Sequence, residues 1–175
     1  MDEFLLIRPS DDYAEQIASY RQEFLLAGDS MDGTGALRKT IDVSEYIKTS
    51  IEREKPENVP MDRVPATQFL FIRKSDNRLL GMLQVRHYFN DYLEKYAGHI
   101  GYSVRPSQRR KGYAKEMLRM ALPYCKKIGI LKVLITCIDG NVGSEKTILA
   151  NGGVYESTIH EPNENIDLKR FWIEL

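Results

Sequence analysis

The chain has 175 residues, of which 42% are hydrophobic and 29% are charged, as expected of one soluble globular domain with a full-sized core. Its 25 basic residues balance 25 acidic ones, which argues against a nucleic-acid or anionic-membrane partner. No apolar run approaches the roughly 20 residues of a membrane span, and the first residues lack the pattern of a secretory signal. Cys125 and Cys137 form neither a disulfide framework nor a zinc motif, so we expect a cytoplasmic protein without a metal site.

The first part of the chain predicts one strand and two helices. Pro9 ends the strand, Ser10 supplies a helix cap, and Gly28 lies where the apolar spacing of the first helix stops. A loop rich in glycine, aspartate, serine and threonine separates the helices. In order, we expect a strand over 4–8, a helix over 13–27, a helix over 43–53 and an irregular stretch over 55–65.

The second part of the chain predicts mostly strands. We expect a hairpin over 67–74 and 78–88, a strand over 98–104, a helix over 113–128, a strand over 132–138, a short helix within 141–153, and closing strands over 154–160 and 169–175. The order is β-α-α-β-β-β-α-β-α-β-β. It predicts a mixed, mostly antiparallel sheet of about seven strands with helices on both faces, an α/β or α+β fold. The irregular stretch is too short to separate domains, so residues 1–175 form a single one.

A cluster of cations follows the strand over 98–104. The segment RPSQRRKGYAKEML, residues 105–118, places Arg105, Arg109, Arg110 and Lys111 before Gly112 and the start of a helix. Unpaired N–H groups and partial positive charge at a helix N-terminus favour an anion, and glycine permits close backbone approach. The pattern is neither a P-loop nor a dinucleotide fingerprint. It therefore predicts a site for another phosphate-rich ligand.

This segment closely resembles motif A of the GCN5-related N-acetyltransferases, whose signature is Arg/Gln-x-x-Gly-x-Gly/Ala. Arg109, Gly112 and Ala114 occupy the three defining positions. The later stretch CIDGNVGSEKTILANGGVYE resembles motif B, with Asn141 and Ser144 in its Asn-x-x-Ser. The predicted order of strands and helices is similar to that fold across nearly the whole chain. The segment GHIGYSVRPSQRRKGYA resembles a branch of predicted bacterial acetyltransferases.

The resemblance implies acetyl-coenzyme A as co-substrate, bound where the strand ending near Val104 splays from its neighbour. It implies that backbone groups of Tyr102, Ser103 and Val104 pair with the pantetheine, and that the Val104 N–H stabilises the oxyanion. Asn141 would bind the pantetheine arm, and Ser144 would contact the cofactor or cap its helix. The residues implied to hold the pyrophosphate are Arg109, Arg110, Lys111, Gly112, Tyr113, Ala114 and Lys115.

The sequence departs from the family pattern at two catalytic positions. Ile148 replaces the tyrosine that serves as general acid in many members, and Thr136 replaces a glutamate base. Tyr155 and Tyr113 are candidate acids, although packing explains each more simply. Among candidate bases, His99 ranks first because an imidazole pKa near 6.5 suits the role, and His87 and Glu94 follow.

The acceptor side would be covered by the first two helices and the loop between them, residues 20–38, where Asp29 and Asp32 could attract a cationic amine or simply form turns. Residues 87–99, rich in aromatics, form either one wall of this pocket or a tip that contacts a second subunit. The acceptor is a small-molecule or peptide amine, and the resemblance also allows a homodimer.

Three functions compete. The first is direct transfer of acetyl from acetyl-coenzyme A to an amine. The second is a non-catalytic acyl-coenzyme-A sensor, which the missing tyrosine and glutamate favour. The third, a nucleic-acid-binding domain, conflicts with the neutral charge and predicts steeply salt-dependent binding.

Overall fold

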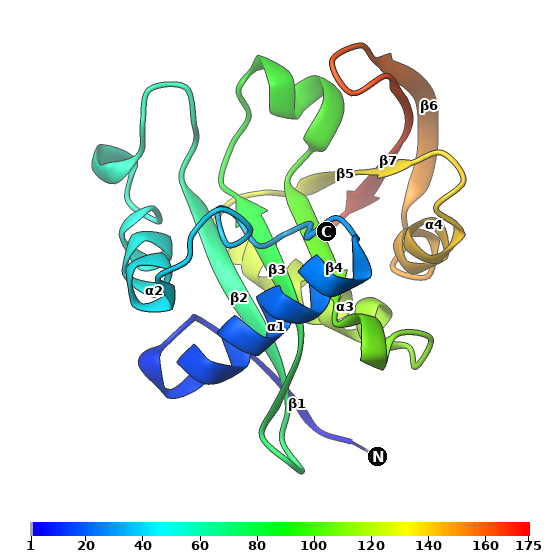
Figure 1. Cartoon of the computed structure of the whole chain (residues 1–175). Coiled ribbons are helices and arrows are strands. Elements are labelled where there is room, and N and C mark those ends of the chain that lie inside the picture. Colours follow the sequence, from blue (N-terminus) through cyan, green and yellow to red (C-terminus); the bar gives the residue numbers. More distant parts are fainter. Residues whose placement is uncertain (1) are drawn as a thin grey trace.

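A computed structural model describes residues 2–175 and has the predicted order of strands and helices (Figure 1). Its strands and helices are β1 (Phe4–Ile7), α1 (Ala14–Ala27), α2 (Val43–Glu52), β2 (Ala66–Arg73), β3 (Arg78–Arg86), β4 (Ile100–Val104), α3 (Tyr113–Lys127), β5 (Lys132–Ile138), α4 (Val142–Leu149), β6 (Val154–Glu161) and β7 (Ile166–Glu174). One π-helical turn, Leu93–Ala97, lies between β3 and β4. Within the described residues, no helix is both long and apolar enough to cross a bilayer.

The strands form two antiparallel sheets, of order β1-β2-β3-β4 and β5-β7-β6. The expected single central sheet is therefore interrupted between β4 and β5. β4 and β5 meet near their first residues, where the His99 N–H donates to the Leu134 carbonyl at 2.8 Å and a single bridge joins Gly98 to Ile135. Farther along, β4 and β5 line opposite sides of one cavity, so their backbones do not pair there. The expected separation near Val104 thus divides the sheet in two.

Alternation along β2 supplies cores to both faces of the first sheet. Leu70 and Ile72 pack with α1 and α2, where Tyr20 and Phe24 are fully buried. Phe69 and Phe71 point to the opposite face, toward α3. Because successive side chains of a strand point to opposite faces, one apolar strand joins two cores.

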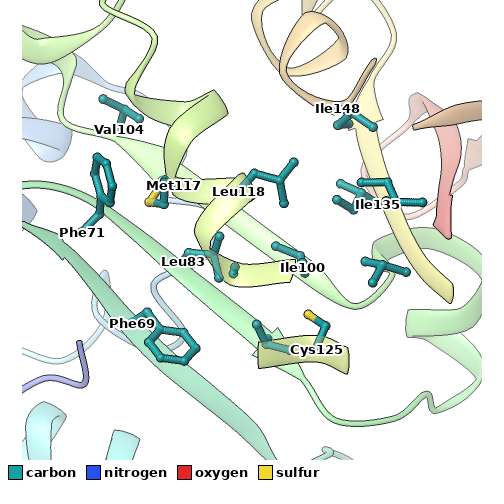
Figure 2. Close-up of a cluster of buried hydrophobic side chains, with 14 of the residues drawn as sticks. Phe69, Phe71, Leu83, Ile100, Val104, Met117, Leu118, Cys125, Ile135 and Ile148 are labelled. Carbon is teal, nitrogen blue, oxygen red and sulfur yellow. The ribbon is translucent and has the colours of Figure 1, made fainter. Parts of the chain in front are cut away.

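Helix α3 bridges the two sheets (Figure 2). Its buried residues Met117, Leu118, Ala121 and Cys125 follow helical spacing. They belong to one cluster with Leu83 and Ile100 of the first sheet and with Ile135 and Phe171 of the second. This packing holds the sheets together behind the opening between β4 and β5.

Candidate active site

A cavity of about 730 Å³ lies between β4 and β5. Its walls come from the end of β4, the start of α3, the end of β5, the start of α4, the loop between α1 and α2, and the β6–β7 turn. It is the place where the two sheets separate. The residues implied by the motifs therefore converge on a concave surface, as a ligand site requires.

The register of β4 directs two of its peptide groups into this opening. The Arg86 N–H donates to the His99 carbonyl, and the Arg105 N–H donates to the Leu80 carbonyl. The β3–β4 register is continuous between these bonds. Because alternate residues of an antiparallel pair bond to the neighbouring strand, Tyr102 and Val104 direct their N–H and C=O groups away from β3, toward the cavity. The Val104 carbonyl accepts from Arg109 Nε at 3.2 Å.

The turn before α3 lines the cavity with Gln108, Arg109, Arg110 and Gly112. Arg110 and Gly112 both have left-handed backbones, with φ of 62° and 80°. A Cβ on Gly112 would meet no atom within 4 Å, so the surface there is open. Successive N–H groups in such a turn, continued by the unpaired N–H groups of the helix, form a concave anion site. The Lys111 side chain does not line the cavity, since its Nζ donates to Gln108 Oε1 at 3.1 Å.

The clustered cations of residues 105–111 are not equivalent. Arg105 is only 5% exposed. Its guanidinium pairs with Glu23 at 3.0 Å and also donates to Ser19 Oγ and to the Leu79 carbonyl. Although burial opposes it, hydrogen bonds from Ser107 and Arg105 lower the pKa of the Glu23 carboxyl. Arg105 therefore anchors α1 to the end of β4 and does not serve the anion turn.

The other residues implied at the cofactor site have mixed surroundings. Ala114 and Lys115 line the cavity at the first turn of α3. Tyr113 also borders it, but its ring packs on Phe4 and its hydroxyl accepts from Arg73 Nη1 at 2.9 Å, so its side chain belongs to the core. Ser103 Oγ lies 2.9 Å from the Tyr20 hydroxyl.

The start of α4 faces β4 through a hydrogen-bonded pair. Asn141 caps α4, its Oδ1 accepting the Ser144 N–H at 3.2 Å. Ser144 Oγ lies 2.8 Å from Tyr102 Oη. Burial raises the pKa of Tyr102 well above its ordinary value, so its hydroxyl keeps its proton at neutral pH. Ile148 is one helical turn beyond Ser144 and is fully buried in the core.

The histidines proposed from the sequence do not reach the cavity wall. His99 is 7% exposed, its Nδ1 accepts the Leu134 N–H at 2.9 Å, and its ring lies 4.0 Å from that of Phe89. Burial and the charge of Arg86 lower its pKa to about 4. A ring whose Nδ1 already accepts a backbone N–H has no free basic nitrogen when neutral. His87 Nε2 bonds to Thr67 Oγ1 at 2.8 Å. The geometry therefore supports structural roles for both rings.

The two remaining sequence candidates, Tyr155 and Glu94, do not line the cavity, whereas Cys137 does. Tyr155 is exposed on β6 and bonds Thr158 Oγ1 at 2.8 Å. Glu94 borders a separate shallow depression with Arg170. Cys137 lines the cavity, and burial raises the pKa of its thiol to about 11, which makes it a poor nucleophile at neutral pH.

The loop between α1 and α2 covers the outer part of β4. Gly33 packs directly on it: a Cβ there would come within 2.2 Å of the Gly101 carbonyl oxygen, and its φ is +71°. The Gly33 carbonyl accepts from Gln68 Nε2 at 2.7 Å, which fixes the loop to β2. Asp29 and Asp32 both border the cavity, as the acceptor hypothesis expected, but Asp29 Oδ2 accepts from Arg109 Nη1 at 2.6 Å.

The opposite end of the cavity contains residues that sequence reasoning missed. Arg86 approaches it from the end of β3, and Tyr92 and Tyr96 from the segment between β3 and β4. Glu161 ends β6, and Glu164 lies in the β6–β7 turn. They are far apart in the sequence and belong to no motif. The only local signal was the aromatic stretch over 87–99. The cavity thus has one end lined by backbone N–H groups and another lined by charged side chains.

A family model described as "Acetyltransferase (GNAT) family" matches residues 39–150. The chain therefore belongs to the GNAT acetyltransferase family, and it is an acyltransferase by class. No curated protein matches the sequence. Within the described residues, no cluster of potential metal ligands is found.

Solved structures share the fold at low identity. The ribosomal-protein-S5-alanine acetyltransferase from Vibrio fischeri is 16% identical, with a TM-score of 0.73 over 99% of this chain and 96% of that one. RimL, a ribosomal L7/L12 alpha-N-protein acetyltransferase solved with coenzyme A, is 15% identical, with a TM-score of 0.72 over 98% and 94%. The microcin C7 self-immunity acetyltransferase MccE, solved with acetyl-CoA and AMP, is 19% identical, with a TM-score of 0.70 over 100% and 94%.

Proposed function

We propose that this protein is an acetyl-coenzyme-A-dependent N-acetyltransferase that moves an acetyl group directly to a primary amine. One observation carries the proposal: the peptide groups of Tyr102 and Val104 face a cavity that also contains the left-handed turn at Arg110–Gly112. A strand edge with unpaired peptide groups suits an extended ligand with amides, and the turn suits its phosphates. Coenzyme A has both features next to each other, since the amides of its pantetheine arm are followed by its pyrophosphate.

The fit assigns roles to the remaining cofactor residues. Backbone N–H groups from Arg110 to Lys115 would hold the pyrophosphate, with the Arg109 and Arg110 side chains adding charge. Lys111 contributes its backbone, because its ammonium is directed to Gln108. Asn141, at the end of β5, would bind the pantetheine arm from the opposite wall.

For the transfer itself, the chain must stabilise charge and move two protons. The Val104 N–H points into the cavity, where it can donate to the negative oxygen that develops during acyl transfer. The amine nitrogen bonds to the acetyl carbon, and the carbon–sulfur bond breaks. Two protons leave the nitrogen in all. The first leaves before attack, because an alkyl ammonium has a pKa of roughly 10 and carries no free electron pair. The second leaves as the amide forms, and one proton joins the sulfur. We assign removal of the first proton to the exposed carboxylates at the charged end of the cavity, Asp32 and Glu164, in place of His99.

We assign protonation of the leaving sulfur to Tyr102. Its hydroxyl bonds to Ser144, on the same face of α4 as Ile148, the position that a tyrosine occupies in other members. Ser144 and Ile148 are four residues apart and therefore lie on one face of α4. Tyr102, which belongs to β4, brings a phenol to that face although α4 itself has no tyrosine there. A thiol has a pKa of about 8.5 and leaves fairly well unaided, so the expected contribution is modest.

The experiment is calorimetric titration of acetyl-coenzyme A into the wild type, Gly112→Glu and Gly112→Ala. Both substitutions force a side chain onto a left-handed backbone, so alanine controls for that strain. Only glutamate adds negative charge to the turn. We expect wild-type binding in the micromolar range and at least about tenfold weaker binding for Gly112→Glu than for Gly112→Ala. Absence of binding to the wild type would contradict the proposal.

A non-catalytic acyl-coenzyme-A sensor is the second candidate, supported by Ile148 and Thr136 at the usual catalytic positions. Both candidates predict binding, and they differ in turnover. Release of coenzyme A thiol in the presence of an amine panel supports the enzyme. Binding without any thiol release supports the sensor.

A further inference from the structure

The charged end of the cavity contains one arginine whose charge no side chain neutralises directly. Arg86 Nη1 donates to the backbone carbonyls of Ala97 at 3.3 Å and Gly98 at 3.2 Å. In the part of the chain that the structure describes, no carboxylate forms an ion pair with it. Arg105 and Arg109, by contrast, each pair with a carboxylate at 3.0 Å or less. Arg86 is therefore a cation, held in place by backbone, that borders a cavity.

Its position is fixed from several sides. Arg86 ends β3, and its N–H bonds to the His99 carbonyl at 2.7 Å. A Cβ on Gly101 would lie 3.3 Å from Arg86 Nη2, so the guanidinium extends across β4 at the point where that strand enters the cavity. Burial lowers the pKa of Arg86, and the nearby charge of Asp32 opposes this change. A desolvated arginine next to an opening gains from an anion that enters it.

Carboxylates lie at the same end of the cavity. Glu161 is fully buried, and its two oxygens accept the N–H groups of Asn163 at 3.1 Å and Glu164 at 2.7 Å. Burial, and then the charges of Glu161 and Glu164, raise the pKa of Tyr92, while Arg86 lowers it. Tyr92 thus lies within electrostatic reach of both the arginine and the two glutamates.

We propose that Arg86 binds a carboxylate on the acceptor, so that the acceptor is an amine bearing its own carboxylate, of the α-amino-acid class. This rests on the proposed function and specifies its substrate. The ammonium group faces Asp32 and Glu164, which are exposed and line the cavity, and the carboxylate receives two N–H donors from the guanidinium. A peptide N-terminus has an amide where the amino acid has its carboxylate, so this arrangement disfavours protein acceptors. Arg86 is a specificity-determining residue.

The test compares matched acceptors with matched variants. Each of a panel of L-amino acids is assayed beside its own amide, which keeps the amine and removes the negative charge, and beside short peptides. The assay measures coenzyme A thiol release. The proteins are the wild type, Arg86→Met, Arg86→Lys and Arg63→Met, a charge-matched control at an exposed residue outside the cavity lining. Acetyl-coenzyme A affinity and thermal unfolding are measured for each.

For the wild type we expect kcat/KM to be at least about tenfold higher for the preferred acid than for its amide. Arg86→Met abolishes this preference, because it lowers kcat/KM for the acid at least about tenfold more than for the amide, mainly by raising KM for the acid. Arg86→Lys retains part of the preference, because it keeps the charge without the paired donors. Arg63→Met behaves as the wild type.

Three results would overturn the inference. Amides or peptides could react as well as acids, or Arg86→Met could lower acid and amide rates equally, as a purely structural role requires. Alternatively, no amino acid could react although acetyl-coenzyme A binds, which rejects the amino-acid acceptor and leaves the cofactor site standing. Failure of acetyl-coenzyme A to bind the wild type would instead reject the proposed function itself.

Discussion

Arg109 Nη1 donates to Asp29 Oδ2 at 2.6 Å, which connects the anion turn before α3 to the loop between α1 and α2. The same guanidinium donates from Nε to the Val104 carbonyl and lies over the Phe24 ring. One arginine of the cofactor motif thus contacts the cofactor strand, the covering loop and the first helix. This residue therefore links the proposed cofactor side of the cavity to its proposed acceptor side.

We expect Asp29→Asn to strengthen acetyl-coenzyme A binding about two- to fivefold at low ionic strength, with the gain falling as salt rises. Removing a negative charge beside an anion site lowers repulsion, and a half-exposed ion pair contributes little to stability. Calorimetry at two salt concentrations measures both effects. Asp62→Asn, at an exposed position outside the cavity lining, is the control for net charge. Weaker binding would mean that Asp29 acts by orienting Arg109.

We expect Arg105→Met to lower the free energy of unfolding by about 3 kcal/mol, because it leaves Glu23 without its buried partner. Arg110→Met should change stability by about 0.5 kcal/mol or less and should instead weaken acetyl-coenzyme A binding. Denaturant unfolding and calorimetry on both variants separate the two roles. If Arg105→Met were as stable as the wild type but bound the cofactor poorly, Arg105 would belong to the anion site after all.

The element order could be predicted because its signals are local: Pro9 after β1, Asp42 before α2, the turn between β2 and β3, and Gly112 before α3. Asp42 caps α2, accepting the Ser44 N–H at 2.9 Å. The separation of β4 from β5 near Val104 was expected only from the family resemblance, because it depends on whether the two strands remain paired after His99 and Leu134. No residue in either strand encodes that separation by itself.

The residues of the candidate site also fall into two groups, those that a sequence motif could predict and those that only the folded structure brings together. Residues of the anion turn adjoin one another in the sequence, so a motif could find them. Arg105 belongs to the same cluster of cations, but the path of the chain turns its side chain toward α1. Arg86 and Glu161 are 75 positions apart in the sequence and border the same cavity only in the folded chain. Their shared position is a property of the tertiary structure, which spacing along one sequence cannot reveal.

We expect Tyr102→Phe to lower kcat about tenfold near pH 7, with a smaller loss above pH 9, where the thiolate leaves without a proton. Acetyl-coenzyme A affinity should stay unchanged, because the phenyl ring preserves the packing. Tyr155→Phe, on the exposed face of β6, should retain full activity. Profiles of kcat against pH for the three proteins test this. An equal loss at every pH would assign Tyr102 a packing role.

We expect His99 to make the protein less stable as the pH falls. The folded protein has a His99 pKa of about 4, below the ordinary 6.5 of an unfolded chain. Between these values the unfolded state binds more protons, so stability is complete above pH 6.5 and declines as the pH falls toward 4. The full difference corresponds to about 3 kcal/mol, since one pKa unit equals roughly 1.4 kcal/mol.

The measurement is denaturant unfolding at a series of pH values for the wild type and His99→Gln. The glutamine Oε1 can still accept the Leu134 N–H, and it does not titrate. The stability of His99→Gln should therefore fall less steeply between pH 6.5 and 4, although carboxylates titrate in both proteins. His160→Gln, at an exposed histidine paired with Asp167, should follow the wild type. If His99→Gln kept the full slope and lost acetyl transfer, His99 would act in catalysis and not in the joint between the two sheets.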